Sequence, residues 1–82
     1  MANTLRANGN REPATLIDAH QLVGRQRPKL DAEPLVWAAF HRRSAEVYAQ
    51  VAKVDTAHRH EAQCYAGLET RRAQEIEDGL TQ

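Results

Sequence analysis

The chain has 82 residues, with eleven basic and eleven acidic side chains and therefore a formal net charge of zero. A chain of this length buries only about 60% of its unfolded surface and forms one domain at most. Fifteen residues are Leu, Val, Ile or Phe and fourteen are Ala, so the core that can form is built from small side chains. The composition argues against a self-repelling disordered chain, a transmembrane protein, a disulfide scaffold and a strongly basic DNA-coating protein. We expect a helical domain with a thin core that needs a second copy or a partner.

Residues 1–12 are the first predicted unit, a mobile arm with a turn-favouring Asn-Gly-Asn cluster. Pro13 follows, and a proline in the first turn favours the start of a helix. Apolar residues then repeat at helical spacing up to Gly24, which we expect to cap the helix. The pattern predicts a short helix over residues 13–23, at the start of a single helical domain that spans residues 13–82.

A long second helix is predicted over residues 32–54, with Asp31 as its cap and Pro34 in its first turn. One face has bulky apolar side chains as far as Val54, and the adjoining face has alanines that let another helix approach closely. We expect the bulky face to fill the core and also to bury against a second copy. The candidate interface residues on this face are Val36, Trp37, Phe40, Val47, Tyr48 and Val51.

The polar stretch after the second helix has neither glycine nor proline, and two folds follow from it. If the chain reverses there, Asp55 or Thr56 caps a third helix over residues 57–78, and Gly79 ends that helix. The fold is then all-α, a short N-terminal helix plus a long antiparallel helical hairpin. If the chain does not reverse, one continuous helix from about 33 to 78 forms a coiled-coil oligomer, with a strongly polar second half to its heptad seam. We predict the hairpin and keep the continuous helix as its alternative.

The densest group of possible metal ligands is His58, His60, Glu61 and Cys64. His60 and Cys64 are four residues apart and face the same way on a helix, as two zinc ligands must. His58 points roughly 160° away from His60 in helical geometry, so one helix does not bring three of these side chains together. We expect Cys64 to lie on the apolar face as a small buried residue. The prediction is no metal site and no cofactor, with these four residues as the candidates if a metal binds.

His58, Glu61 and Tyr65 share one face of the predicted third helix, and Glu61 could orient His58 as in a general-base pair. Such a trio more often satisfies its own hydrogen bonds and fixes how helices pack. His41 and Ser44 form a second possible pair, but no acid follows at a spacing that would orient the histidine. Neither group comes with a glycine-rich loop or a nucleophile motif. We therefore expect no catalytic residues and a protein that is not an enzyme.

Arg25, Arg27 and Lys29 form a basic connector between the first two predicted helices. These three side chains are the candidate phosphate contacts if the protein binds nucleic acid. The other basic residues have acidic residues interspersed among them, which is typical of solvated helix faces and not of one basic surface. We expect nucleic-acid binding to be the weaker alternative.

The single cysteine, Cys64, excludes an intramolecular disulfide and favours a reducing, cytoplasmic setting. No apolar run has the length of a signal peptide or a membrane span, so we expect no membrane partner. The sequence therefore predicts a cytoplasmic protein-protein interaction or adaptor module that forms a homo-oligomer, such as a dimer, or docks on a helical partner. A small metal-binding protein or enzyme that uses residues 58–64 is one alternative. A nucleic-acid-associated regulator that uses residues 25–29 is the other.

Overall fold

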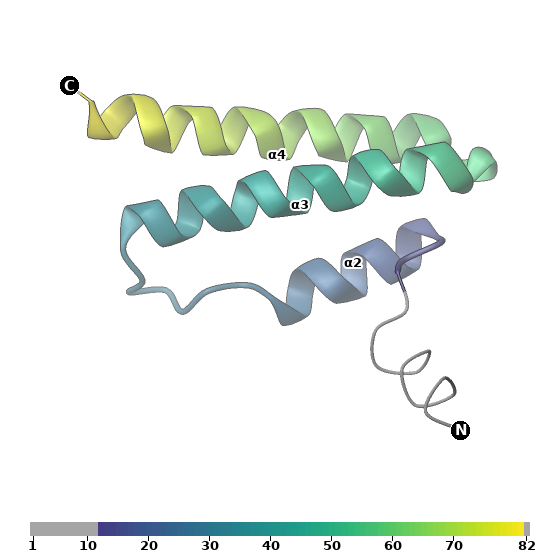
Figure 1. Cartoon of the computed structure of the whole chain (residues 1–82), viewed down its shortest axis with the longest axis horizontal. Coiled ribbons are helices and arrows are strands. Elements are labelled where there is room, and N and C mark those ends of the chain that lie inside the picture. Colours follow the sequence, from purple (N-terminus) through teal and green to yellow (C-terminus); the bar gives the residue numbers. More distant parts are fainter. Residues whose placement is uncertain (1–11, 82) are drawn as a thin grey trace.

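The computed structural model describes residues 12–81, which form three α-helices and one short 3-10 turn and contain no β-strand (Figure 1). The predicted arm over residues 1–12 lies outside the described residues, apart from Glu12. None of the described helices is both long enough and apolar enough to cross a membrane. The predicted all-α class is confirmed. The elements are α2 at Leu16–Arg25, α3 at Pro34–Val54, the 3-10 turn η1 at Thr56–His58 and α4 at Arg59–Leu80.

The two long helices, α3 and α4, run antiparallel as a hairpin, and α2 lies alongside α3 (Figure 1). The chain reverses at Asp55, whose backbone leaves the helical region with φ −95° and ψ 79°. Asp55 N–H still donates to Val51 O at 2.8 Å, and His58 N–H then donates to Asp55 O at 3.1 Å. The predicted reversal is confirmed, and the continuous helix is wrong. However, α4 begins only at Arg59, so neither Asp55 nor Thr56 caps it as expected.

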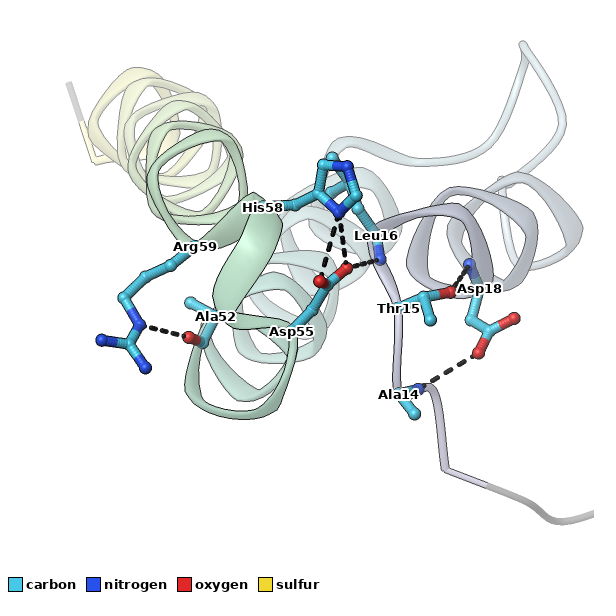
Figure 2. Close-up of polar contacts among 8 residues, drawn as sticks. All are labelled: Ala14, Thr15, Leu16, Asp18, Ala52, Asp55, His58 and Arg59. Atoms are coloured by element: carbon cyan, nitrogen blue, oxygen red, sulfur yellow. Dashed lines mark hydrogen bonds and ion pairs between the residues drawn. The ribbon is translucent and has the colours of Figure 1, made fainter.

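The first helix, α2, begins at Leu16 because Thr15 caps it. Asp18 N–H donates to Thr15 Oγ1 at 3.1 Å, and Ala14 N–H donates to the Asp18 carboxylate at 3.2 Å (Figure 2). This reciprocal pattern is close to a capping box, which gives partners to N–H groups that the first turn leaves unpaired. The start predicted at Pro13 is therefore wrong, since the cap follows the proline.

The start of α3 also lies later than expected. Pro34 is its first residue, and Glu33 before it has an extended ψ of 149°. A residue that precedes proline is disfavoured in the helical region because its backbone clashes with the proline ring. Asp31 is consequently outside the helix and does not cap it.

Both glycines that were expected to end helices lie inside them. Gly24 is within α2, which ends at Arg25, and Gly79 is within α4, which ends at Leu80. No glycine among residues 12–81 has the positive φ that makes this residue a helix cap. The end of α2 is closed instead by Gln26 N–H, which bonds to carbonyl groups of the last turn.

The core lies where the alanine face of α4 meets α3 and α2. The only apolar residues that α4 buries are Ala62 and Ala73, so the bulk comes from the other two helices. Val36 and Val54, which were expected on the core face of α3, are 48% and 57% exposed. The predicted bulky face is therefore correct in the middle of α3 and wrong at its two ends. The buried core cluster is Ala19, Val23, Phe40, Tyr48, Val51, Ala52 and Ala62.

Candidate functional site

The predicted trio of His58, Glu61 and Tyr65 does not come together. His58 Nδ1 lies 3.0 and 3.1 Å from the two carboxylate oxygens of Asp55, and Glu61 is exposed to solvent. The ring of Tyr65 stacks on that of Tyr48, with centroids 5.1 Å apart and planes at 23°. The sequence pattern therefore identified a histidine that is oriented by a carboxylate but assigned it to the wrong acid.

His60 and Cys64 face the same way on α4, as their spacing predicts. Cys64 Sγ lies 3.8 Å from His60 Nε2, across one turn of the helix. Cys64 is a free, exposed thiol, so its expected burial is wrong: it lies on the side of α4 away from the alanine face. Nowhere in residues 12–81 do three His, Cys, Asp or Glu side chains gather closely enough to hold one metal ion.

Asp55 joins the hairpin to α2. Its carboxylate accepts the backbone N–H of Leu16 at 2.9 Å and also pairs with His58 (Figure 2). Leu16 N–H is one of the N-terminal donors that α2 cannot satisfy internally, and a negative charge is favoured at this end of a helix. The N–H from Leu16 is the largest cause that lowers the pKa of Asp55; burial opposes the shift and His58 adds to it. Asp55 therefore caps a helix distant in sequence, although sequence reasoning placed it on α4.

The contact at Asp55 makes the attachment of α2 depend on pH. A carboxyl group whose pKa is lowered by folding stabilises the protein fully above its ordinary pKa, here 3.8, and loses this contribution as the pH falls through the folded-state value. We expect Asp55→Asn to weaken the protection of the first α2 amides against hydrogen exchange at neutral pH. In this variant, the protection should also fall less than in the wild type when the pH is lowered into the acid range.

Glu77→Gln is the matched control for that measurement. Arg42 lowers the pKa of Glu77 through a hydrogen bond, so this variant also loses an acid-dependent contact, but one that joins α3 to α4. Its α2 amides should exchange as in the wild type. Unchanged α2 exchange in Asp55→Asn would show that the carboxylate does not hold this helix.

A buried hydrogen bond links the two long helices. His41 Nδ1 on α3 lies 2.5 Å from Glu69 Oε1 on α4, and the two residues are only 8% and 5% exposed. Arg72 Nη1 approaches the other carboxylate oxygen at 3.5 Å. The sequence did not predict this pair, because Glu69 is 28 positions from His41 and lies on the other long helix. Local spacing does not show how two helices are aligned.

Ser44 lies beside this pair in sequence but does not complete a catalytic site. Its Oγ is buried and has no hydrogen-bond partner among the described residues, and no hydrogen bond joins it to His41. Serine, histidine and glutamate are the residue types of a hydrolase triad, but Ser44, His41 and Glu69 are all enclosed in the core and out of reach of a substrate. Of the three, only His41 and Glu69 are bonded to each other, and their contact joins α3 to α4.

A second polar contact holds α2 against the hairpin. His20 Nδ1 lies 2.7 Å from the Tyr48 hydroxyl, and the His20 ring packs edge-on against both Tyr48 and Tyr65. Burial raises the pKa of the Tyr48 phenol, and the nearby charge of Glu69 adds to the shift. All three helices therefore meet at this aromatic cluster, which is structural in character.

The basic connector does not present three equivalent charges. The Arg27 guanidinium lies over the Phe40 ring, 5.4 Å from its centroid, and so forms a cation–π contact with the core. Arg25 is in the last turn of α2, where the helix dipole stabilises a positive charge. Lys29 is exposed in the connection that follows. The structure gives each of the two arginines a favourable place that does not involve phosphate.

The predicted interface residues divide into buried and accessible members. Phe40, Tyr48 and Val51 are buried inside the chain, so they are not available to a second copy in this conformation. Trp37 and Val47 are half-buried against the core. Of the six, Val36 has the largest exposure. The accessible part of the predicted interface is therefore at the start of α3 and not along its middle.

Other large apolar side chains are also exposed at or near that end of the hairpin. Because α4 is antiparallel to α3, its last residue, Leu80, lies at the same end as the start of α3 (Figure 1). The exposed fractions are 94% for Leu30, 67% for Leu35, 48% for Val36 and 47% for Leu80. We call these four residues the apolar end.

A shallow groove of about 530 Å³ lies between α3 and α4, away from the apolar end. The groove forms because small side chains, which include Ala52 and Ala66, line it. At one side of it, Arg59 Nε donates to Ala52 O at 3.0 Å (Figure 2). The polar side chains that line it are Lys53, Arg59 and Gln63, which supply no nucleophile, base and acid together.

Comparison of the chain with protein-family models, curated proteins and solved structures finds no match. What the protein does must therefore follow from its own surface.

Proposed function

We propose that the protein is a non-enzymatic helical interaction module that self-associates through the apolar end. The observation that supports the proposal is the exposure of Leu30, Leu35, Val36 and Leu80 at or near one end of a domain whose buried residues are largely alanine. The burial of exposed large apolar side chains is the main favourable contribution to association. A reducing, cytoplasmic setting is part of the proposal and is supported by the single free thiol of Cys64.

The size of the apolar end sets the expected affinity. Burial of four partly exposed Leu and Val side chains from each of two copies contributes on the order of 10 kcal/mol. Loss of free translation and rotation opposes association by roughly 4 to 15 kcal/mol. The balance favours association by at most about 6 kcal/mol, so we expect a weak dimer with a dissociation constant of roughly 40 μM or higher. A larger helical partner with a matching apolar surface can replace the second copy.

Polar substitutions at the apolar end are expected to weaken the dimer. The double variant Leu35→Ser/Val36→Ser removes two exposed side chains that the monomer does not need, so it should raise the dissociation constant at least tenfold, or about 1.4 kcal/mol, and leave the helical content unchanged. Sedimentation velocity across a concentration series measures this constant.

Ile17→Ser is the matched control, because Ile17 is 67% exposed, as Leu35 is, but lies near the opposite end of the hairpin. It follows Leu16, whose N–H bonds to Asp55. It should leave the dimer intact. A wild-type chain that stays monomeric at several hundred micromolar, or an equal effect from Ile17→Ser, would contradict self-association through the apolar end.

A further inference from the structure

The outer face of α4 has two side chains of types that bind metal ions, His60 and Cys64, and neither belongs to the apolar end. His60 and Cys64 are both exposed on the side of α4 away from the core, and Nε2 and Sγ lie 3.8 Å apart. In a tetrahedral zinc site, with Zn–N of about 2.0 Å and Zn–S of about 2.3 Å, the nitrogen and sulfur ligands lie about 3.6 Å apart. The pair therefore matches an edge of such a tetrahedron to within a few tenths of an ångström, without movement of the helix.

One chain does not complete this site. Zinc takes four ligands in a structural site, and no third His, Cys, Asp or Glu side chain of the described residues joins these two. His58, the nearest other histidine in sequence, is instead paired with Asp55 at 3.0 Å. The two missing ligands must come from outside the chain.

Gly67 makes the same face of α4 accessible to a second helix. It lies one turn beyond Cys64 in the interior of a 22-residue helix, where glycine is unfavourable. A Cβ atom at this position would meet nothing within 4 Å, so packing inside the chain does not require glycine. Its absence of a side chain does allow another α4 to approach the surface that holds His60 and Cys64.

We propose that two copies of the chain bind one divalent cation of the zinc type between their α4 helices, with His60 and Cys64 from each copy as the ligands. Two neutral imidazoles and two thiolates form a Cys₂His₂ set, and each thiol releases its proton when it binds. The two thiolate charges then balance the charge of the cation. This contact uses a different surface from the apolar end, so it does not depend on the proposed self-association.

The test is a titration of the full chain with Co²⁺, followed by Zn²⁺ competition, in the presence of a phosphine reductant that prevents a Cys64 disulfide. We expect a thiolate-to-cobalt charge-transfer band that saturates at one metal ion per two chains, and loss of the band on addition of Zn²⁺. Sedimentation of Leu35→Ser/Val36→Ser with and without Zn²⁺ separates the two surfaces. Zinc should convert this variant from monomer to dimer.

Cys64→Ser and His60→Gln should each abolish the half-equivalent stoichiometry and the zinc-dependent dimer. Both side chains are exposed, so these variants should keep the wild-type circular dichroism. His58→Gln, two residues before His60, is the matched control and should bind as the wild type does. Saturation at one ion per monomer, an absent charge-transfer band, or equal binding by His60→Gln would overturn the proposal.

Discussion

Replacement of Phe40 by alanine is expected to lower the free energy of unfolding by about 3 to 5 kcal/mol. Phe40 is completely buried and is one of the largest side chains in the core. It packs edge-on against Trp37 at 5.7 Å, and its other neighbours include Arg27 in the connector. Since the rest of the core is mostly alanine, few side chains can move to fill the cavity.

This loss is large in comparison with the free energy of unfolding of the whole domain. A chain of this length has an unfolding free energy of roughly 4 to 12 kcal/mol. Urea denaturation followed by circular dichroism should show a midpoint for Phe40→Ala that is far below that of the wild type. Ile17→Ala is the control, because this side chain is 67% exposed, lies outside the apolar end, and leaves no cavity when it is removed. A change below about 1 kcal/mol for Phe40→Ala would mean that the core is not the one described.

Removal of one partner from the buried pair of His41 and Glu69 is the second large effect. His41→Leu leaves a carboxylate that is 5% exposed with only Arg72 nearby at 3.5 Å. A buried charge without its partner destabilises a protein by roughly 3 to 5 kcal/mol, because burial removes its hydration and the lost hydrogen bond no longer compensates for that removal. Denaturant midpoints of the single variants measure this penalty.

The double variant His41→Leu/Glu69→Leu tests whether the penalty arises from the unpaired group. Two apolar side chains of similar size should restore most of the stability, because replacement of a buried ion pair by well-packed hydrophobic residues is often neutral or better. Glu77→Leu is the comparison on the surface, since Arg42 and Glu77 form their pair in solvent and solvent weakens it. A double variant as unstable as His41→Leu would show that the pair itself stabilises the hairpin.

Local sequence patterns predicted which segments are helical and where the chain turns. The helical periodicity of the apolar positions and the polar stretch at Asp55 favoured the hairpin over one continuous helix, but they left both folds open. The ends of the helices were less predictable. Thr15 became a cap and Gly24 did not, since several residues near each end can satisfy the same N–H and C=O groups.

The composition and periodicity of the sequence by themselves determined an all-α chain with a thin, alanine-rich core, and the four-residue spacing placed His60 and Cys64 on one side of a helix. Only the tertiary structure decided which face of each helix is buried, because alanine is compatible with either side and the choice depends on the shape of the neighbouring helix. It also decided the partners of His41 and Asp55. Both contacts join residues 28 or more positions apart, and such contacts depend on how the helices are aligned, which local sequence does not contain.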